Sequence, residues 1–371
     1  MKIASFETEH FFARHEFSTP YQLCNSDCES LSIAELLALA GESPEQLGRQ
    51  RLGYTESQGN PELRQSIASL HAAVNAEDVV MLGTPVEGIY LAARALLDPG
   101  DEVIVLTPAY DALIKMFEHV VGAEQVRRWK FEPTETSWQL DLDELRRLIT
   151  PKSRLVVVNF PHNPTGYLPT PGFQQELTAL IEEYGLRIFS DEMYFGLVQP
   201  GTPPIASAAD VTKNAIALSG LSKTYGLPGL RSGWLIVRDE AVRENIMNWK
   251  FYTSICPPGP TQYLASLALR AGKALRERNV TRIAQNTKLA DAFFARWPEL
   301  FSWRRPAAGS TALVGYNVPS VSAVSEKLAK EEGILIQSAG MLGGDDQHMR
   351  IGLGRDGFAA ALGKFEDWLN R

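Results

Sequence analysis

Lys223 has unusual neighbours for a lysine. It lies in the stretch LSGLSKTYGLPGLRSGW (218–234), where Ser, Gly and Pro surround it, Arg231 follows, and acidic residues are absent. A lysine amine on a flexible stem can form a Schiff base with an aldehyde, provided that burial and neighbouring groups favour the neutral amine. The stretch therefore indicates a candidate for covalent catalysis, with an ordinary solvated loop lysine as the alternative.

Polar residues follow four predicted strands, each at the point where the strand ends. The stretches EVIVLTPAYD, VVVNFPHNPTG, LRIFSDEMY and AIALSGLSK place at these ends Tyr110, Asn163, Asp191 with Tyr194, and Ser222 with Lys223. In an open parallel sheet, ligands bind at the carboxyl ends of the strands. We therefore expect these side chains to converge on one site.

Between about residue 60 and residue 240, strand-like and helix-like segments alternate. The stretch 60–74 begins with Asn60 as an N-cap and Pro61 as the first helical residue, and its apolar residues keep a helical period. Short apolar runs bounded by turn residues, such as 102–106, are typical of buried strands in a parallel sheet. This alternation predicts an α/β layer with a mostly parallel central sheet.

The pattern changes in the last third of the chain. One long helical stretch, 260–297, precedes the strand-like TALVGY, a helix near 320–332, the strands GILIQ and HMRIGL, and a last helix. This order indicates a smaller α+β unit. We predict a large domain over 46–262 and a small domain formed by 1–45 together with 263–371.

Composition narrows the class of protein. The net charge of −8 gives no reason to expect binding to nucleic acid or to anionic membranes, and no apolar stretch is long enough to span a bilayer. The N-terminus lacks the continuous apolar region of a signal peptide, so we expect a cytoplasmic protein with reduced cysteines. Cys24 and Cys28, with His10 and His15, match no standard zinc spacing, and no metal site is predicted.

Seven stretches carry a resemblance to a known family. They are YTESQGNPELR, LLDPGDEV, TPAYD, PHNPTG, SDEMY, LSKTYGLPGLRSGW and MRIGL, and they span residues 54–353. The set resembles the fold-type I pyridoxal-phosphate enzymes, specifically the class I/II aminotransferases. The resemblance implies the α/β fold of that group, with a mostly parallel sheet in a large domain and a smaller α+β domain, and it implies pyridoxal 5'-phosphate as cofactor.

The resemblance also implies roles for the strand-end residues. Lys223 would form the Schiff base, and Asp191 would pair with the pyridine nitrogen so that the ring can absorb carbanion charge. Asn163 and Tyr194 would hydrogen-bond the phenolic oxygen of the cofactor, and Tyr110 would stack on its ring. Without the resemblance, Asp191 could cap a helix and Tyr110 could be a core aromatic.

Further residues are assigned to the phosphate and the substrate in the same way. Ser222 and Arg231 would bind the phosphate, and Tyr54 would reach the phosphate of a neighbouring subunit, which implies a homodimer with shared active sites. Arg350 would clamp the α-carboxylate of the substrate, with Asn163 as a second substrate contact. The alternatives are a loop aromatic for Tyr54 and a strand-end arginine in a surface ion pair for Arg350.

The expected phosphate site departs from the family pattern. Phosphate is usually also held at a helix N-terminus, which here reads LGTPVEGIY, with Val86 where the family usually has a hydroxyl and Pro85 without an N–H. Thr84 is the candidate replacement contact. Gly220 stands three residues before Lys223, where the family often carries Ser or Thr, so we expect one phosphate contact to be missing or replaced.

The N-terminal stretch YQLCNSDCESLSIAELLAL resembles the opening of capreomycidine synthase-like members, which eliminate and cyclise. Asn25 and Ser26 would then line the substrate pocket. The predicted function is an aminotransferase that acts on an α-amino acid and a 2-oxo acid in two ping-pong half-reactions. A lyase or cyclase with the same cofactor is the alternative, and a non-catalytic sensor of the same fold is a further one.

Overall fold

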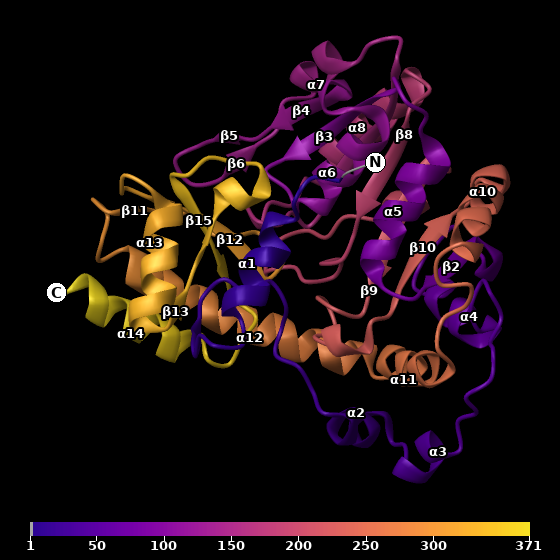
Figure 1. The fold of residues 1–371 in the computed structure, drawn as a ribbon, viewed down its shortest axis with the longest axis horizontal. Coiled ribbons are helices and arrows are strands. Elements are labelled where there is room, and N and C mark those ends of the chain that lie inside the picture. Colours follow the sequence, from indigo (N-terminus) through magenta and orange to yellow (C-terminus); the bar gives the residue numbers. More distant parts are fainter. Residues whose placement is uncertain (1–2) are drawn as a thin grey trace.

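The computed structural model describes residues 3–371, and a seven-stranded sheet forms its centre (Figure 1). The strand order is β2 (Val79–Leu82), β10 (Gly233–Val237), β9 (Ala215–Gly220), β8 (Arg187–Asp191), β7 (Ser153–Asn159), β3 (Glu102–Thr107) and β4 (Val126–Lys130). Strand β10 is antiparallel to both of its neighbours, and the other six strands run in one direction. The predicted mostly parallel sheet is therefore confirmed.

Successive side chains of each strand point to opposite faces of the sheet, and both faces are apolar. Helices therefore cover both faces. One face packs against α5 (Pro85–Leu96), α6 (Ala112–Val121) and α10 (Glu240–Phe251). The other face packs against α2 (Ile33–Ala40), α4 (Pro61–Ala68), α7 (Leu142–Leu148), α8 (Pro171–Glu183), α9 (Ala208–Val211) and α11 (Gly259–Arg270). In β2, Val80 and Leu82 enter the first core, while Val79 and Met81 enter the second.

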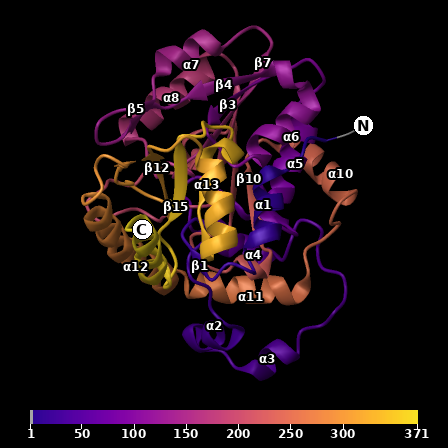
Figure 2. The same cartoon turned by 60° about the vertical axis from the view of Figure 1, so that its left-hand side comes forward.

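A second, smaller layer has its own antiparallel sheet and core (Figure 2). The strand order is β11 (Phe301–Ser302), β12 (Thr311–Tyr316), β15 (His348–Gly352) and β14 (Gln337–Ser338), and residues of α12 (Gly272–Phe294), α13 (Val321–Lys327) and α14 (Phe358–Leu369) complete the core. The short pairs are β1 (Tyr21–Gln22) with β13 (Ile334–Leu335) and β5 (Glu132–Pro133) with β6 (Trp138–Gln139). The domain boundaries given above stay a prediction.

The N-terminal helix α1 (Glu7–His15) joins the two layers, while the short α3 (Pro44–Gly48) lies at the far end of the molecule (Figure 1). The backbone N–H of Thr8 donates to Asp111 Oδ2 at 3.2 Å, just before α6 of the large layer. The Thr8 hydroxyl donates to the carbonyl of Met341 at 3.3 Å and accepts from Gln337 at 3.2 Å, both in the small layer. No helix within residues 3–371 has the length and apolar character to cross a membrane.

Three predicted helices differ from the observed ones. The helix predicted over 60–74 ends at Ala68, because the backbone N–H groups of Ala72 and Ala73 donate to the carboxylate of Asp210 instead. The stretch 260–297 is two helices, α11 and α12, that meet at Ala271. The helix near 320–332 is α13 followed by a wider π-helical turn over Leu328–Glu332.

The glycine at 220 and the proline at 85 are parts of one packing arrangement. Gly220 of β9 pairs in register with Gly233 of β10, and Pro85 packs against this pair. A Cβ on Gly220 would lie 2.8 Å from the carbonyl oxygen of Ser232 and 3.1 Å from Pro85 Cγ. A Cβ on Gly233 would lie 2.8 Å from Pro85 Cγ. The chain therefore lacks room for a side chain at either glycine.

We predict that Gly220→Ala destabilises the protein by roughly 1–3 kcal/mol, because the added methyl group overpacks a contact between backbone and Pro85. Urea unfolding followed by circular dichroism measures the change. Gly229→Ala is the matched control: a Cβ there meets nothing within 4 Å, and its free energy of unfolding should stay within about 0.5 kcal/mol of the parent. Equal stability of the two variants would contradict the packing account.

Candidate active site

A cavity of about 440 Å³ opens at the carboxyl ends of β3, β7, β8 and β9. Its lining includes most of the residues predicted from the sequence: Asn25, Pro85, Val86, Tyr110, Asn163, Asp191, Tyr194, Ser222, Lys223, Arg231 and Arg350. Two predicted residues lie outside it. Thr84 stands behind Arg231, and Tyr54 is exposed on the surface of the chain.

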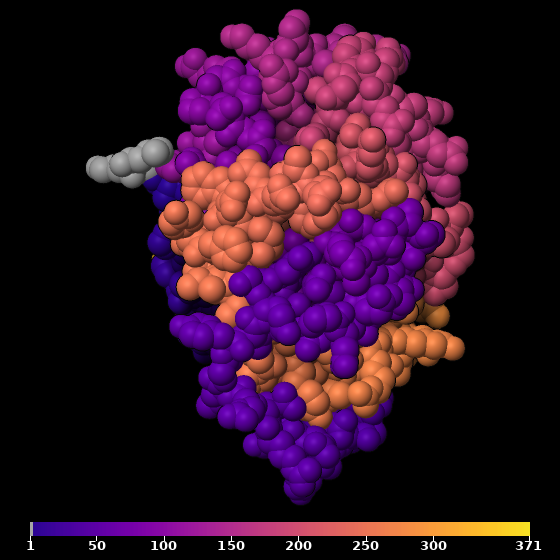
Figure 3. Space-filling view, turned by 90° about the vertical axis from the view of Figure 1, so that its right-hand side faces the viewer, coloured from indigo at the N-terminus to yellow at the C-terminus, as the bar shows by residue number. Residues whose placement is uncertain are grey.

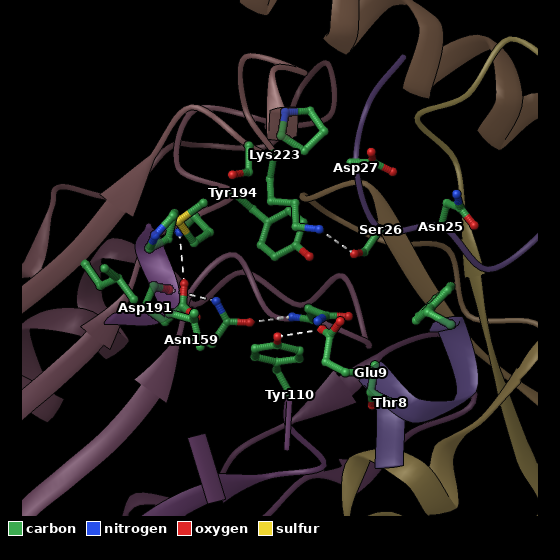
Figure 4. A pocket seen from close by; sticks show the side chains of 18 of the residues that line it. Thr8, Glu9, Asn25, Ser26, Asp27, Tyr110, Asn159, Asp191, Tyr194 and Lys223 are labelled. Carbon is green, nitrogen blue, oxygen red and sulfur yellow. Dashed lines mark hydrogen bonds between the residues drawn. The ribbon is translucent and has the colours of Figure 1, made fainter. Parts of the chain in front are cut away.

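Lys223 lies in the turn that follows β9, and its amine points into the cavity (Figure 4). Its Nζ donates to the hydroxyl of Ser26 at 2.8 Å. Burial lowers the pKa of this amine, while the charge of Asp27 opposes that shift. A lysine whose neutral form is favoured is the kind of amine that attacks a carbonyl carbon.

Asp191 is the last residue of β8, and its carboxylate is buried at the base of the cavity. Its Oδ1 accepts a hydrogen bond from the backbone N–H of Met193 at 3.0 Å. Burial raises the pKa of this carboxyl to about 6, and the hydrogen bond and the charge of Lys223 offset burial only in part. Turns rather than a helix follow the strand, so Asp191 does not act as a helix cap.

Asn159 is a site residue that the sequence reasoning missed. It ends β7, its Nδ2 donates to the carbonyl of Asp191 at 2.7 Å, and its Oδ1 accepts from the backbone N–H of Asn163 at 2.7 Å. The side chain thereby fixes the ends of two strands relative to each other. The available signal was the polar residue directly after the apolar run VVV, the same signal that singled out the other strand ends.

Arg350 lies in the small layer, in β15, and reaches the cavity from the side opposite the large sheet. It is 2% exposed, and its Nε and Nη2 donate to the carbonyl of Cys24 at 3.1 and 2.9 Å. Its Nη1 donates to Asn163 Oδ1 at 3.3 Å. These partners are neutral, so Arg350 is not in the surface ion pair that was the alternative, and its charge is available to an anion in the cavity.

Ser222 and Arg231 form a polar end of the cavity beside the start of α5. The Nη1 of Arg231 donates to the carbonyl of Pro228 at 2.9 Å, and its Nη2 donates to the hydroxyl of Thr84. Thr84 therefore orients the guanidinium from behind. A guanidinium, a hydroxyl and a helix N-terminus together suit a phosphate.

Tyr110 and α1 form the wall on the N-terminal side. The hydroxyl of Tyr110 donates to Glu9 Oε1 at 2.8 Å, and its ring lies 5.2 Å from the ring of Phe6 between centroids. Burial raises the pKa of the Tyr110 phenol, as it does for Tyr194, so both are neutral hydrogen-bonding groups at ordinary pH. The sequence did not indicate that α1 forms part of the cavity wall, because this helix reaches the cavity through contacts between residues that are far apart in the chain.

The side chains present fit the implied cofactor. Pyridoxal phosphate has three chemically different parts: a pyridine nitrogen, an aldehyde and a phosphate. The cavity offers a buried carboxylate at Asp191, an amine at Lys223, and a guanidinium with a hydroxyl at Arg231 and Ser222. The raised pKa of Asp191 is the most specific sign, because a buried carboxylate of this kind is stabilised by a cation such as a protonated pyridine.

Comparison with known proteins agrees with this chemistry. Residues 22–356 match the family model for class I and II aminotransferases, and the chain belongs to this family of pyridoxal-phosphate-dependent enzymes. Capreomycidine synthase of Streptomyces vinaceus is 29% identical over 93% of this chain and 88% of that protein. A probable aspartate aminotransferase of Methanocaldococcus jannaschii is 27% identical over 75% of this chain and 78% of that protein.

Two solved structures show the same fold over the full length. A pyridoxal-phosphate-dependent aminotransferase from Streptococcus suis is 30% identical, covers 100% of this chain and 99% of its own, and superposes with a TM-score of 0.92. The pyridoxal-phosphate-dependent cyclase OrfR is 23% identical, covers 100% of this chain and 98% of its own, and has a TM-score of 0.91. The fold-type I assignment is thereby confirmed.

We predict that Asp191→Asn stabilises the protein freed of cofactor. The folded-state pKa, about 6, lies above the ordinary value of 3.8, so the folded state holds the proton more tightly, and ionisation costs free energy as the pH rises from about 4 to about 6. The variant should therefore gain up to about 3 kcal/mol near pH 7.5 and less near pH 5. Urea unfolding at the two pH values measures this difference.

The exposed Asp367→Asn is the control, and its free energy of unfolding should stay within about 0.5 kcal/mol of the parent. Adding pyridoxal phosphate should then stabilise the parent protein more than Asp191→Asn, because a protonated pyridine pairs with a carboxylate better than with an amide. An Asp191→Asn protein that is less stable than the parent at the higher pH would contradict the prediction.

Proposed function

We propose that this chain is a pyridoxal-phosphate-dependent aminotransferase that moves an amino group from an α-amino acid to a 2-oxo acid. The observation that carries the proposal is that one cavity is lined by an amine with a lowered pKa, a buried carboxylate and a buried guanidinium: Lys223, Asp191 and Arg350. The first two suit the cofactor, and the third suits the α-carboxylate of an amino acid.

When bound, pyridoxal phosphate supplies an electron sink for the negative charge that develops at the substrate Cα. Asp191 would accept a hydrogen bond from the protonated ring nitrogen and so would keep the ring cationic. Arg350 would bind the α-carboxylate through the N–H groups that Cys24 and Asn163 leave free, and would thereby fix the direction of the Cα–H bond. Lys223 would hold the cofactor at its aldehyde carbon and, when its Nζ is free, would take the proton from Cα and return it.

Ser26 gives Lys223 a defined position when the amine is not bonded to cofactor. Its Oγ lies 2.8 Å from Nζ, and the Ser26 carbonyl accepts from the hydroxyl of Ser310 at 2.5 Å, which anchors this part of the N-terminal segment on the small layer. The amine is therefore held near the cavity rather than released to solvent. Such positioning reduces the entropy that the proton transfer must overcome.

We also propose a homodimer in which Tyr54 contributes to the partner's site. Tyr54 is 92% exposed, and Leu52 and Tyr252 are 90% exposed, an unusual degree of exposure for large apolar side chains. The loop of Tyr54 is bound to the chain near α11, because the hydroxyl of Thr55 donates to the carbonyl of Pro257 at 2.7 Å. Figure 3 shows the face of α4, α10 and α11 on which these segments meet.

A lyase or cyclase is the second candidate, and the similarity to capreomycidine synthase over 93% of the chain favours it. Lys223, Asp191 and Arg350 would serve both reactions, which diverge only after the proton has left Cα. A single-turnover experiment without a 2-oxo acid separates them. Transamination yields one equivalent of 2-oxo acid and pyridoxamine phosphate, whereas elimination or cyclisation proceeds through many turnovers with no pyridoxamine phosphate.

We predict that Lys223→Ala loses the visible absorbance of lysine-bound pyridoxal phosphate and retains at most trace turnover, since it removes both the attachment point and the base. The exposed Lys213→Ala is the control and should keep the spectrum and the activity of the parent. Spectra and turnover numbers of the purified proteins measure the effect. Normal turnover by Lys223→Ala would refute the assignment.

We further predict that Arg350→Lys raises KM for α-amino acids about ten- to a hundredfold, because one point charge replaces two parallel hydrogen bonds. The visible spectrum of the holoenzyme should not change. Steady-state kinetics with Arg305→Lys, an exposed position, gives the reference. A spectral change with an unaltered KM would instead place Arg350 at the cofactor.

A further inference from the structure

Glu87 is an acidic residue in the first turn of α5, the helix that begins at the polar end of the cavity. Its backbone N–H donates to the carbonyl of Thr84 at 3.1 Å, so it belongs to the same turn as the threonine behind Arg231. A carboxylate near a helix N-terminus stabilises the helix, but it also repels a phosphate that binds at the same end. A phosphate site can keep such a carboxylate only if its charge is directed elsewhere.

The carboxylate of Glu87 lies outside the cavity, and both of its oxygens accept hydrogen bonds. Oε2 accepts from the backbone N–H of Gly83 at 2.8 Å, and Oε1 accepts from the hydroxyl of Thr253 at 2.6 Å. The preceding residues, Pro85 and Val86, line the cavity, whereas Glu87 does not. The side chain therefore fixes the turn before α5 and does not contact a ligand.

The loop after α10 supplies Thr253, and this loop has one defined shape. The backbone N–H groups of Thr253 and Ile255 donate to the carbonyl of Lys250 at 3.0 and 3.1 Å, and Lys250 Nζ donates to the carbonyl of Ile255 at 3.1 Å. Ile255 has a φ of 61°, a left-handed conformation that a β-branched residue adopts only where its surroundings impose it. Thr253 is therefore a fixed partner for Glu87.

Lys250 also provides a positive charge on this side of Glu87. Its side chain is fully buried, burial lowers the pKa of its amine, and the negative charge of Glu87 opposes that shift. A buried ammonium group and a neighbouring carboxylate attract each other strongly, because little water screens them. The charge of Glu87 is therefore directed toward α10 and away from the phosphate end.

The turn that Glu87 fixes also orients the guanidinium of Arg231. The hydroxyl of Thr84, next to Gly83, accepts from Nη2, and Nη1 donates to the carbonyl of Pro228 at 2.9 Å. The backbone of Arg231 has a φ of 47°, which is again the left-handed region, so its conformation depends on the contacts around it. A continuous set of contacts therefore runs from Glu87 to Arg231 by way of the turn before α5.

We propose that Glu87 is a positioning residue for the phosphate end of the cofactor site, because it fixes the turn whose Thr84 orients Arg231. This inference rests on the cofactor that the proposed function uses, and not on the reaction that follows. The competing account is that Glu87 only stabilises α5. Its loss would then weaken the helix without any selectivity for the phosphate.

The test compares two ligands that have the same ring and the same aldehyde, pyridoxal phosphate and pyridoxal. Their Kd values for the full-length protein freed of cofactor are measured by absorbance titration, and the ratio of the two values reports on the phosphate end. We expect Glu87→Ala to raise Kd for pyridoxal phosphate about five- to thirtyfold, the range for lost hydrogen bonds to a charged group, and to leave Kd for pyridoxal within about twofold. An unchanged Kd for pyridoxal also shows that the variant is folded.

Three further variants complete the test. Thr84→Val keeps the shape of the side chain without its hydroxyl and should show the same selective loss, and the double variant should lose less than the product of the two single losses. Glu87→Gln should retain part of the affinity, because its amide oxygen still accepts a hydrogen bond. Glu240→Ala is the matched control, since it removes an exposed acidic side chain from the first turn of α10 and should keep both Kd values.

Four results would overturn the positioning role. They are an equal rise of both Kd values in Glu87→Ala, no change in either value, losses that multiply in the double variant, and tighter binding of pyridoxal phosphate by Glu87→Gln than by the parent. The last would show that the carboxylate acts on the phosphate by repulsion.

The proposed function is judged separately, by whether α-amino acids convert the parent holoenzyme in single turnover. A phosphate-selective loss in Glu87→Ala without that conversion would leave the positioning role standing and refute the aminotransferase. Conversion by the parent without a selective loss in the variant would do the opposite.

Discussion

The buried carboxylate of Asp191 is the constraint around which the site is built. A carboxylate at the end of a buried strand is unfavourable in the absence of a cation, and the raised pKa of Asp191 expresses that cost. The register of β7 and β8, which pairs Asn159 with Asp191, lets the Asn159 amide hold the Asp191 carbonyl and the Asn163 N–H together. The end of β8 is therefore fixed with Asp191 buried, and a cationic ring is the partner that fits its carboxylate.

At the polar end of the cavity, the start of a helix approaches two strands closely. Pro85 packs on Gly220 and Gly233, so the start of α5 lies against the ends of β9 and β10 without intervening side chains. A Cβ at position 220 would lie 2.8 Å from the carbonyl oxygen of Ser232, so a side chain with a hydroxyl would not fit there. Thr84 contributes from behind instead, by orienting the guanidinium of Arg231. The departures at Pro85 and Gly220 thus belong to one close contact.

The fold and the residues at the carboxyl ends of the strands were predictable because short stretches of sequence indicate both. Short apolar runs, such as 103–106 and 155–158, marked the strands, and each polar residue at a strand end lies within a few positions of its strand. Glu9, Glu16 and Arg355 could not be found in this way, because they reach the cavity through contacts such as Thr8 with Asp111 and Arg355 with Asp27, which link distant parts of the chain. The helix predicted over 60–74 ends early for the same reason, because Asp210, which is distant in the chain, accepts hydrogen bonds from two of its N–H groups.

The contact between Arg350 and the Cys24 carbonyl has a consequence for when the cavity can form during synthesis of the chain. It joins residues 326 positions apart, and the contact of Lys223 with Ser26 spans 197. During synthesis the large sheet and its lysine emerge from the ribosome well before β15. The cavity is therefore complete only after nearly the whole chain has been made. A nascent chain therefore holds Lys223 before Arg350 has been made, and under the proposed function the substrate site forms only once the small layer has folded.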